Sequence, residues 1–574
     1  MMKNKVLNFL QSSGFLLPLF LLIGAGLSVF LKYEIMWDFA NYHYYNPWAF
    51  LTGRIGYDIA PAGLNSYFNP LMDIPLYLLI KYFNDMPNLI YAFQGLYFGG
   101  LMFVFFKLLA LCFDTSSRQG KLSLAAAFAI GLTGWAVWVQ IGTSSNEIPI
   151  TLLVLCGFYL LMRELFFYQS GSCRIYFISG FLLGTAMGLK LTAFIYCLSI
   201  GFSLLVFYRS VVAPKRNIAS FIAGGLLGFL VFDGFWMYLM WSHFDNPAFP
   251  FLNNIFHSDY MPAINFHDTK HLPQNLWQWL FFPLYRAIYK VGAEENALVL
   301  DYRLPLTYIV LLIGLTVLLF KRFKSSISPR TGFIITNFIL GYVLWLSVFA
   351  TSRYTVFLDL LLAMILVKAY VFAFPKRERL QPLYLSLGII IAYSLLSTPY
   401  FSDYFEKRTQ VDYQSRTKVY WLAKKMAVPQ QNMDNAFIKI EKLKLPPDTL
   451  ILQFAQPNAF LLPLLATDSI RALNMYHRMF VADDASNAYE MINMFNLGKW
   501  LELKEKIFAE HKGPIVALFV EDGSFFHPIW LQINPRLKNM KCRPLINNIM
   551  TNTICYPPEL ETQIFSTQEV KDGQ

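Results

Sequence analysis

The densest group of residues capable of chemistry lies directly after the first apolar segment of the chain. Residues 37–48 read Trp-Asp-Phe-Ala-Asn-Tyr-His-Tyr-Tyr-Asn-Pro-Trp, a mixture of polar and aromatic side chains. A carboxylate that aromatic rings partly shield from water can accept a proton from a hydroxyl group or hold a cation. Asp38 is therefore the candidate general base. The alternative is that the aromatic side chains form a belt at a membrane surface and that Asp38 caps a short helix.

The same stretch and the residues after it supply further groups that could face a ligand. These are Asn41, Tyr42, His43, Tyr45, Asp58 and Asn69, and farther along the chain Asn246 and Tyr354 are candidates for the same substrate pocket. Asp38, His43 and Asp58 together offer the oxygen and imidazole groups of a divalent cation site, although their spacing does not require one, and no cofactor is certain. Equally, the Asn-Pro pairs and glycines of this stretch form turns, in which His43, Asp58 and Asp73 have structural roles.

Three cations stand at the ends of otherwise apolar segments. They are Lys190 in Gly-Leu-Lys-Leu-Thr, Arg303 in Asp-Tyr-Arg-Leu-Pro, and Arg353, which precedes Tyr354. A cation kept at that depth binds an anion, and a lipid phosphate offers one through charge-assisted hydrogen bonds. These side chains are therefore candidate phosphate ligands. The alternatives are that they extend to the membrane surface or pair with a nearby carboxylate. Such carboxylates are Asp233, Asp301 and Asp359.

The composition indicates which elements must position these groups. Of the 574 residues, 56% are hydrophobic and only 14% are charged, whereas about 25% of residues are charged in soluble domains. The chain is therefore predicted to lie in a bilayer. Its net charge of +11 comes from short basic clusters between apolar runs, where positive charge keeps loops in the cytoplasm. This distribution argues against a nucleic-acid partner and indicates membrane lipids instead.

Apolar windows of about 20 residues predict about eleven membrane-spanning helices. They lie near residues 13–31, 88–112, 122–140, 148–167, 175–188, 191–208, 217–240, 304–320, 331–350, 355–373 and 382–398. Basic residues follow alternate spans, which predicts a cytoplasmic N-terminus and an extracytoplasmic C-terminus in a bacterial inner membrane. The first span has a basic start, as in a cleaved signal peptide. It lacks an Ala-x-Ala site and is long enough to span, which favours an uncleaved anchor.

This topology places two long loops, residues 32–87 and 241–303, on the outer face. The first contains an apolar stretch at 71–83 that is short and holds Pro75, so we expect an interfacial or re-entrant helix rather than a span. The second contains Asn-Pro-Ala-Phe-Pro-Phe-Leu-Asn, beginning at Asn246. Two prolines make this a rigid turn that could cover a site.

The chain divides near residue 400, where hydropathy falls. Residues 1–399 are predicted to form the transmembrane domain with both outer loops, and residues 400–574 to form a small α/β domain outside the membrane. Helical segments of this tail are expected at 413–426 and 486–508, and strands at 449–454, 514–520 and 551–556. Cys542 and Cys555 flank two strand-like runs, which predicts a hairpin closed by a disulfide. Two free thiols are the alternative.

The arrangement resembles the GT-C membrane glycosyltransferases, which use polyprenyl-phosphate sugars. The resemblance covers roughly residues 10 to 400 and rests on an acidic residue in the first outer loop, a polytopic helical bundle, Asn-Pro-x-Phe-Pro-x-x-Asn at 246–253, a Gly-Leu-Lys turn and a late Arg-Tyr. It implies that Asp38 is the catalytic carboxylate and that Lys190 and Arg353 contact the donor phosphate. The sequence departs from the family in having no clear Asp-x-Asp or Glu-x-Asp pair, which leaves metal dependence open.

The resemblance implies transfer of a sugar from a polyprenyl-phosphate donor to a lipid, glycan or protein acceptor on the outer face of the membrane, with inversion. Lys190, Arg353 and Arg303 would hold the phosphate, and Asp38 would deprotonate the acceptor. Two other classes of function stay open. A transporter or flippase usually places ionisable groups near the bilayer midplane and shows inverted repeats. A scaffold would bind a partner through the outer domain, which does not account for polar groups at several outer helix ends.

Overall fold

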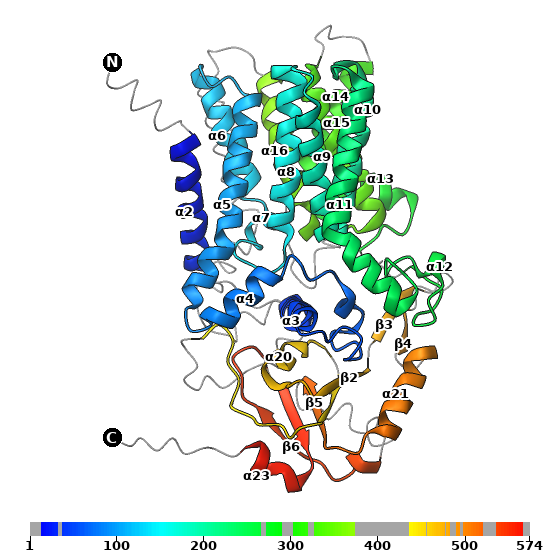
Figure 1. The fold of residues 1–574 in the computed structure, drawn as a ribbon. Coiled ribbons are helices and arrows are strands. Elements are labelled where there is room, and N and C mark those ends of the chain that lie inside the picture. The colour runs from blue at the N-terminus through cyan, green and yellow to red at the C-terminus, as the bar shows by residue number, and fades with distance from the viewer. Residues whose placement is uncertain are drawn as a thin grey trace, which may run out of the picture. The chain divides into compact units, whose positions relative to one another are not determined.

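The structure is a computed structural model (Figure 1). It describes residues 13–31, 37–265, 271–289, 302–319, 327–373, 436–454, 456–476, 478–482, 489–493, 498–520, 535–550 and 552–565. The chain separates into two compact units. The helical unit comprises residues 1–33, 91–234 and 268–411, and the sheet unit comprises residues 34–90, 235–267 and 412–574. The boundary predicted at residue 400 lies outside the described residues.

Apolar helices form the helical unit (Figure 1). The main helices along the chain are α2 Ser13–Leu31, α5 Pro87–Cys112, α6 Arg118–Leu132, α7 Trp135–Trp138, α8 Glu147–Arg163, α9 Cys173–Leu189, α10 Phe194–Val206, α11 Pro214–Phe244, α13 Leu276–Tyr289, α14 Arg303–Leu319, α15 Pro329–Val348 and α16 Val356–Ala373. Within the described ranges, six stretches are long and apolar enough to cross a membrane. A helix satisfies its backbone hydrogen bonds internally, which a bilayer demands. The chain is a polytopic helical membrane protein, as predicted.

Several predicted spans are shorter than expected. Helices α9, α10 and α14 have 17, 13 and 17 residues. The span predicted at 122–140 is instead the 15-residue helix α6, which ends at Leu132, followed by the four-residue helix α7. The interruption frees residues 139–146 to form an irregular connection to α8. The span predicted at 382–398 lies outside the described residues.

Glycines allow α9 and α11 to pack with their backbones in contact. A Cβ atom at Gly180 would lie 1.9 Å from the carbonyl oxygen of Phe221, and one at Gly184 would lie 1.9 Å from that of Gly225. No side chain fits at these distances. Small residues spaced four apart serve the same purpose in other pairs of membrane helices.

A mixed five-stranded sheet forms the core of the second unit (Figure 1). Its strands are β1 Leu450–Phe454, β2 Arg471–Tyr476, β5 Ile515–Val520, β6 Lys541–Leu545 and β7 Asn552–Tyr556, in the order β2-β1-β5-β7-β6. Strand β1 is parallel to β2 and β5, whereas β7 is antiparallel to β5 and β6. The three tail strands predicted from the sequence match β1, β5 and β7. The C-terminal part of the chain is therefore a mixed β-sheet domain.

The helix predicted at 486–508 is only partly correct. Helix α21 spans Gly498–Glu510, but residues 489–493 form strand β4, which pairs antiparallel with β3, Arg478–Ala482. Strand β2 was not expected from the sequence either. The helix predicted at 413–426 lies outside the described residues.

The first long loop, residues 32–87, folds against this sheet from residue 37 onward. Its elements are η1 Phe39–His43, α3 Tyr45–Leu51, η2 Gly63–Tyr67 and α4 Ile74–Phe83. Ile59 forms a parallel bridge with Leu473 of β2, and Phe39 shares a buried core with Phe460 and Ile451. Helix α4 has 10 residues and is therefore about 15 Å long. It is too short to span a bilayer, as expected from its sequence.

The end of α11, from residue 235, and the first part of the second long loop belong to the same unit. The indole of Trp236 donates a hydrogen bond to the Tyr67 carbonyl at 3.1 Å. Phe244 and Phe249 stack with their ring centres 4.3 Å apart, and Trp500 of α21 lies beside Phe244, 6.1 Å between ring centres. The short helix α12, Asn253–Phe256, follows. Aromatic packing thus joins this loop to the first loop and to the tail.

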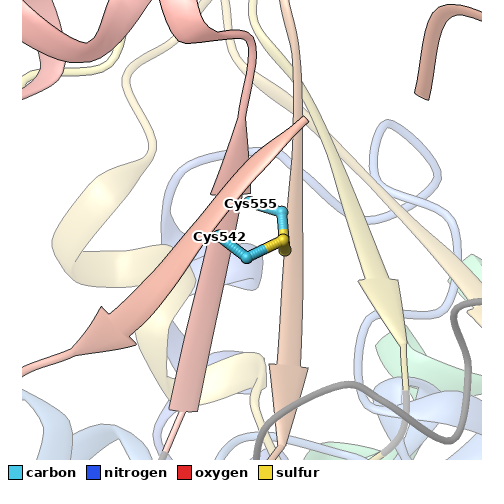
Figure 2. Close-up of a disulfide and its surroundings, with 2 residues drawn as sticks. All are labelled: Cys542 and Cys555. Atoms are coloured by element: carbon cyan, nitrogen blue, oxygen red, sulfur yellow. A yellow bond between two sulfur atoms is a disulfide. The ribbon is translucent and has the colours of Figure 1, made fainter. Parts of the chain in front are cut away.

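Strands β6 and β7 form a hairpin at one edge of the sheet, and a disulfide joins Cys542 to Cys555 (Figure 2). The two residues oppose each other in the antiparallel register, with their Cα atoms 4.1 Å apart. The hairpin and the pairing are those that the sequence predicts. The cross-link fixes an edge strand to the rest of the sheet.

Candidate functional site

Two groups of polar residues carry the predicted chemistry, and each lies within one unit. The loop cluster, in the sheet unit, consists of Asp38, Asn41, His43, Asn46 and Asp73. The helix-end cluster, in the helical unit, consists of Gln140, Ser145, Glu147, Lys190, Arg353 and Tyr354.

The loop cluster is buried because its backbone winds into helix immediately. From residue 39 to 51 the chain forms η1 and then α3, and side chains such as Tyr44 and Trp48 turn into the core. Asp38 precedes these helices and is only 8% exposed. It stands at the N-cap position of η1, but its side chain makes no capping hydrogen bond. Capping is therefore not what holds this carboxylate in the protein.

Two asparagines of the loop cluster are held through their amide nitrogens. Asn41 Nδ2 donates to the carbonyl of Ala62 at 3.3 Å, and Asn46 Nδ2 donates to the carbonyl of Asn65 at 2.8 Å. Because both partners are carbonyl oxygens, the orientation of each amide group is fixed. The oxygens Oδ1 of both residues are buried without a hydrogen-bond partner among the described residues.

His43 and Asp73 form a buried pair. The Nδ1 atom of His43 lies 2.8 Å from Oδ1 of Asp73, and the Tyr42 ring lies against the imidazole, with 4.2 Å between ring centres. The other ring nitrogen, Nε2, is buried and has no hydrogen-bond partner in the part of the chain that the structure describes. The pair therefore orients one nitrogen of the imidazole and leaves the other available.

Asp58 belongs to a buried ion pair instead of a ligand site. Arg54 donates from Nε to Oδ2 at 2.7 Å and from Nη2 to Oδ1 at 2.8 Å. The Ala472 amide and the Tyr45 hydroxyl also donate to this carboxylate. Burial raises the pKa of Tyr45, and the neighbouring Asp58 carboxylate raises it further. These contacts saturate Asp58 within the protein, which corrects the expectation that Asp58 and Tyr45 face a substrate.

The divalent cation site suggested for Asp38, His43 and Asp58 is not assembled. The Arg54 guanidinium occupies the carboxylate of Asp58, and His43 is bonded to Asp73. Across the described ranges, no three His, Cys, Asp or Glu side chains are grouped so that they could hold a metal ion.

Two further asparagines predicted to face a substrate shape turns. Asn246 donates from Nδ2 to the Phe251 carbonyl at 3.0 Å, and its Oδ1 accepts from the Ala248 amide at 2.9 Å. Asn69 Oδ1 accepts from the Leu71 amide at 3.1 Å. Asparagine stabilises turns by bonding to its own backbone two residues onward. This is the structural alternative that the sequence left open.

The helix-end cluster forms where α9 ends and α8 begins. Lys190 is the C-cap residue of α9 and has an extended backbone, so the chain leaves the helix there. Its ammonium group pairs with Glu147, the first residue of α8, and donates to the Ser145 carbonyl at 2.7 Å. The Glu147 side chain is 5% exposed and that of Lys190 is 19% exposed. Lys190 is thus a partly exposed cation that is held by a buried carboxylate.

A second cation, Arg353, lies near Lys190 because both contact the ring of Tyr354. Lys190 Nζ lies 5.7 Å from the centre of the Tyr354 ring, and Arg353 Cζ lies 5.2 Å from it. The Arg353 guanidinium also donates to the Tyr354 hydroxyl at 3.3 Å. Gln140 donates to the Arg353 carbonyl at 2.9 Å and accepts from the Ser145 hydroxyl at 2.8 Å. The structure therefore brings Lys190, Arg353 and Tyr354 together.

The contacts of Arg303 are of another kind. Its Nη1 donates to the Ile130 carbonyl at 2.7 Å, and Nη2 lies 3.7 Å from Oδ2 of Asp359. A Cβ atom at Gly134 would lie 2.6 Å from the guanidinium, so this glycine lets Arg303 pack closely against the chain. Asp359 is one of the partners that the sequence offered. We therefore assign Arg303 a structural role and leave it out of the phosphate site.

Sequence reasoning missed Glu147, Gln140 and Ser145. The carboxylates offered as partners for the three cations did not include Glu147, which pairs with Lys190 from 43 residues away in the sequence. The available signal was a lone carboxylate at the start of an apolar helix, because ionisable groups at that depth are usually paired.

No protein-family model matches the chain, and no curated protein matches its sequence. Its fold is similar to the crystal structure of ArnT from Cupriavidus metallidurans bound to undecaprenyl phosphate. The TM-score is 0.52 at 13% sequence identity, over 96% of this chain and 99% of ArnT. The chain therefore has a fold like that of ArnT. This agrees with the fold class expected from the sequence. At this identity, the comparison shows the fold alone.

Proposed function

We propose that the protein is a membrane glycosyltransferase that moves a sugar from a polyprenyl-phosphate donor to a lipid, glycan or protein acceptor. The observation that carries the proposal is the helix-end cluster, where Lys190 and Arg353 share the ring of Tyr354. Two cations at helix ends suit a lipid phosphate, which they bind through charge-assisted hydrogen bonds. The ArnT-like fold supports it, because the ArnT crystal structure contains undecaprenyl phosphate.

In the proposed reaction, the acceptor oxygen attacks the anomeric carbon from the face opposite the phosphate and inverts that centre. The bond from the anomeric carbon to the phosphate oxygen breaks, and its electron pair stays on the phosphate. The proton of the acceptor hydroxyl passes to the Asp38 carboxylate. Lys190 and Arg353 stabilise the charge that develops on the leaving phosphate. Each group thus has one role in a balanced displacement.

We further propose that the reaction occurs on the outer face of a bacterial inner membrane. Basic residues follow alternate apolar spans, which supports a cytoplasmic N-terminus and an extracytoplasmic tail. The disulfide in the tail supports the same orientation, since such bonds persist in oxidising compartments.

The test is transfer of radiolabelled sugar from a panel of polyprenyl-phosphate donors in membranes that contain equal amounts of wild type or Asp38→Asn. Asparagine keeps the shape of the side chain but cannot accept the proton, so we expect transfer to slow by about 10²- to 10⁴-fold. Asp468→Asn is the matched control, because Asp468 is an exposed carboxylate in the same unit. It should transfer at the wild-type rate.

The outcomes separate the alternatives. Equal rates for wild type and Asp38→Asn would remove Asp38 from the mechanism while keeping the class of enzyme. Absence of transfer by the wild type from every donor would contradict the proposal. Movement of a labelled lipid-linked glycan across vesicle membranes would then be measured, because a flippase is the main competing function.

A further inference from the structure

The side-chain hydrogen-bond donors of the loop cluster are bonded within the protein, whereas several of its acceptors have no partner among the described residues. Asn41 and Asn46 donate through Nδ2 to backbone carbonyls of the stretch 62–68. Their Oδ1 atoms are buried and lack partners among the described residues, although Asn41 is 0% exposed and Asn46 is 1% exposed. Rotating either amide would place two oxygens face to face, so these atoms must be acceptors.

His43 adds a third acceptor. Asp73 is a carboxylate, so the Nδ1 atom that lies 2.8 Å from it carries the proton in the neutral ring. The lone pair of His43 is then on Nε2, which is buried and lacks a partner in the described parts of the chain. The side chains of Asn41, His43 and Asn46 all reach residues between 62 and 73. The three acceptors therefore lie along one short stretch of the loop.

Buried polar atoms in folded proteins are almost always hydrogen-bonded, to protein, water or ligand. Three acceptors without a protein donor call for a partner rich in donors. A phosphate diester does not qualify, because it presents acceptors only. Sugar hydroxyls do qualify, and their apolar C–H faces pack against aromatic rings. Such rings are present here, since Tyr42 packs against His43 and meets Phe68 edge to face, 5.4 Å between centres.

We infer that the loop cluster is a binding site for the hydroxyl groups of a sugar, recognised through Asn41 Oδ1, Asn46 Oδ1 and His43 Nε2. The inference rests on the proposed function. It adds which atoms of the protein would recognise the sugar. Asp73 acts as a positioning residue, because it sets which nitrogen of His43 accepts. Two sources supply such hydroxyls: the sugar on the lipid donor and a sugar acceptor.

The experiment measures dissociation constants of the full chain in nanodiscs for undecaprenyl phosphate and for undecaprenyl phosphate carrying glucose, galactose or mannose. If the donor sugar occupies the cluster, at least one glycosylated lipid binds about tenfold more tightly than the bare lipid, the worth of one good hydrogen bond. Asn41→Leu and His43→Phe should remove this advantage. Leucine keeps the branching of the asparagine side chain, and phenylalanine keeps an aromatic ring at position 43 for the contact with Tyr42.

Asn84→Leu is the matched control. Asn84 lies in the same unit, but both its donor and its acceptor have partners. Its Nδ2 donates to the Ile438 carbonyl at 2.7 Å, and its Oδ1 accepts from the Ile438 amide at 2.8 Å. It should lower stability and keep the preference for the glycosylated lipid. A preference that falls equally in all three variants would overturn the inference, because it would report general damage to the unit.

A second arm identifies the source of the hydroxyls. Methyl glucoside, galactoside and mannoside are added to the protein with undecaprenyl phosphate present, and the midpoint of thermal unfolding is followed. A midpoint raised in the wild type and unchanged in Asn41→Leu assigns the cluster to an acceptor sugar. No preference in either arm overturns the inference. Failure of the bare lipid to bind, with a glycoside effect retained, contradicts the proposed phosphate site alone.

Discussion

Two buried ion pairs, one in each unit, differ in how completely the protein satisfies them. Arg54 and Asp58 are bonded bidentately, and backbone groups and a tyrosine complete their shells. Lys190 and Glu147 are joined by one contact, Glu147 Oε2 is without a partner among the described residues, and Lys190 remains partly exposed beside Tyr354. A saturated pair indicates architecture, whereas an unsaturated pair at a helix end indicates a place for a ligand.

The two clusters also differ in whether they offer hydrogen-bond donors or acceptors to a ligand. The helix-end cluster presents the donors of Lys190 and Arg353, which suit phosphate oxygens. The loop cluster presents the acceptors of Asn41 and His43, which suit hydroxyl groups. A glycosyl phosphate has both kinds of group. The chain therefore contains chemistry for each part of the proposed donor.

The largest effect should come from breaking the saturated pair. Asp58→Asn leaves the Arg54 guanidinium buried without its counter-charge, at a cost of about 3–5 kcal/mol. Thermal unfolding in detergent, followed by tryptophan fluorescence, should show a clear fall in the midpoint for the sheet unit. Glu561→Gln, which removes an exposed partner of Lys541, should change the midpoint little. A similar loss in both variants would refute the distinction between the two kinds of pair.

Next in size is the loss of the unsaturated cation. Lys190→Met should weaken binding of undecaprenyl phosphate by about 10- to 100-fold, the value of a charge-assisted hydrogen bond. Lys368→Met is the control, since Lys368 is also a lysine of the helical unit, lies within α16 and donates to the Cys112 carbonyl. It should bind the lipid normally. Because Lys190→Met also strands Glu147, the double variant with Glu147→Gln is needed, and affinity restored by that second change would assign the defect to stability.

A third buried cation, Lys504, tests the cost of burying a charge, which here exceeds the opposing effect of Glu505 on its pKa. Burial lowers the pKa of Lys504, in α21, from 10.5 to about 8. Below pH 8 both the folded and the unfolded chain carry this proton, and the folded state bears the whole cost. Between pH 8 and 10.5 only the unfolded chain binds it, so stability rises with pH. Lys504→Met should stabilise the unit by roughly 1–3 kcal/mol at pH 7 and remove that rise, as measured by unfolding midpoints from pH 7 to 10.

The smallest effect on ligand binding is expected at Arg303. Its contacts with Ile130 and Asp359 make it similar to the saturated ion pair of Arg54 and Asp58. Arg303→Gln should leave the dissociation constant for undecaprenyl phosphate unchanged while it lowers the unfolding midpoint. A loss of affinity as large as that of Lys190→Met would return Arg303 to the phosphate site.

The helices were predictable because a bilayer forces apolar segments into one structure, and the hairpin of Cys542 and Cys555 was predictable from local pattern. The grouping of Lys190 with Arg353 followed from their placement at helix ends. The partner Glu147 did not, because nothing local links residues 43 apart. Likewise, the docking of Ile59 on Leu473 has no signal in either segment, and therefore the saturation of Asp58 was invisible from the sequence.

The first long loop can fold fully only after its partners in the C-terminal sheet have been synthesised. Arg54 donates to the carbonyls of Thr467 and Ile470, and Asp58 accepts from Ala472, across 413 to 416 residues of chain. The ribosome makes the loop more than 400 residues before these sheet partners. The proposed catalytic loop therefore reaches its final form only after the helices α5 to α16 have been synthesised. A chain that stops short of β2 would keep its helices and lose the support of Asp38.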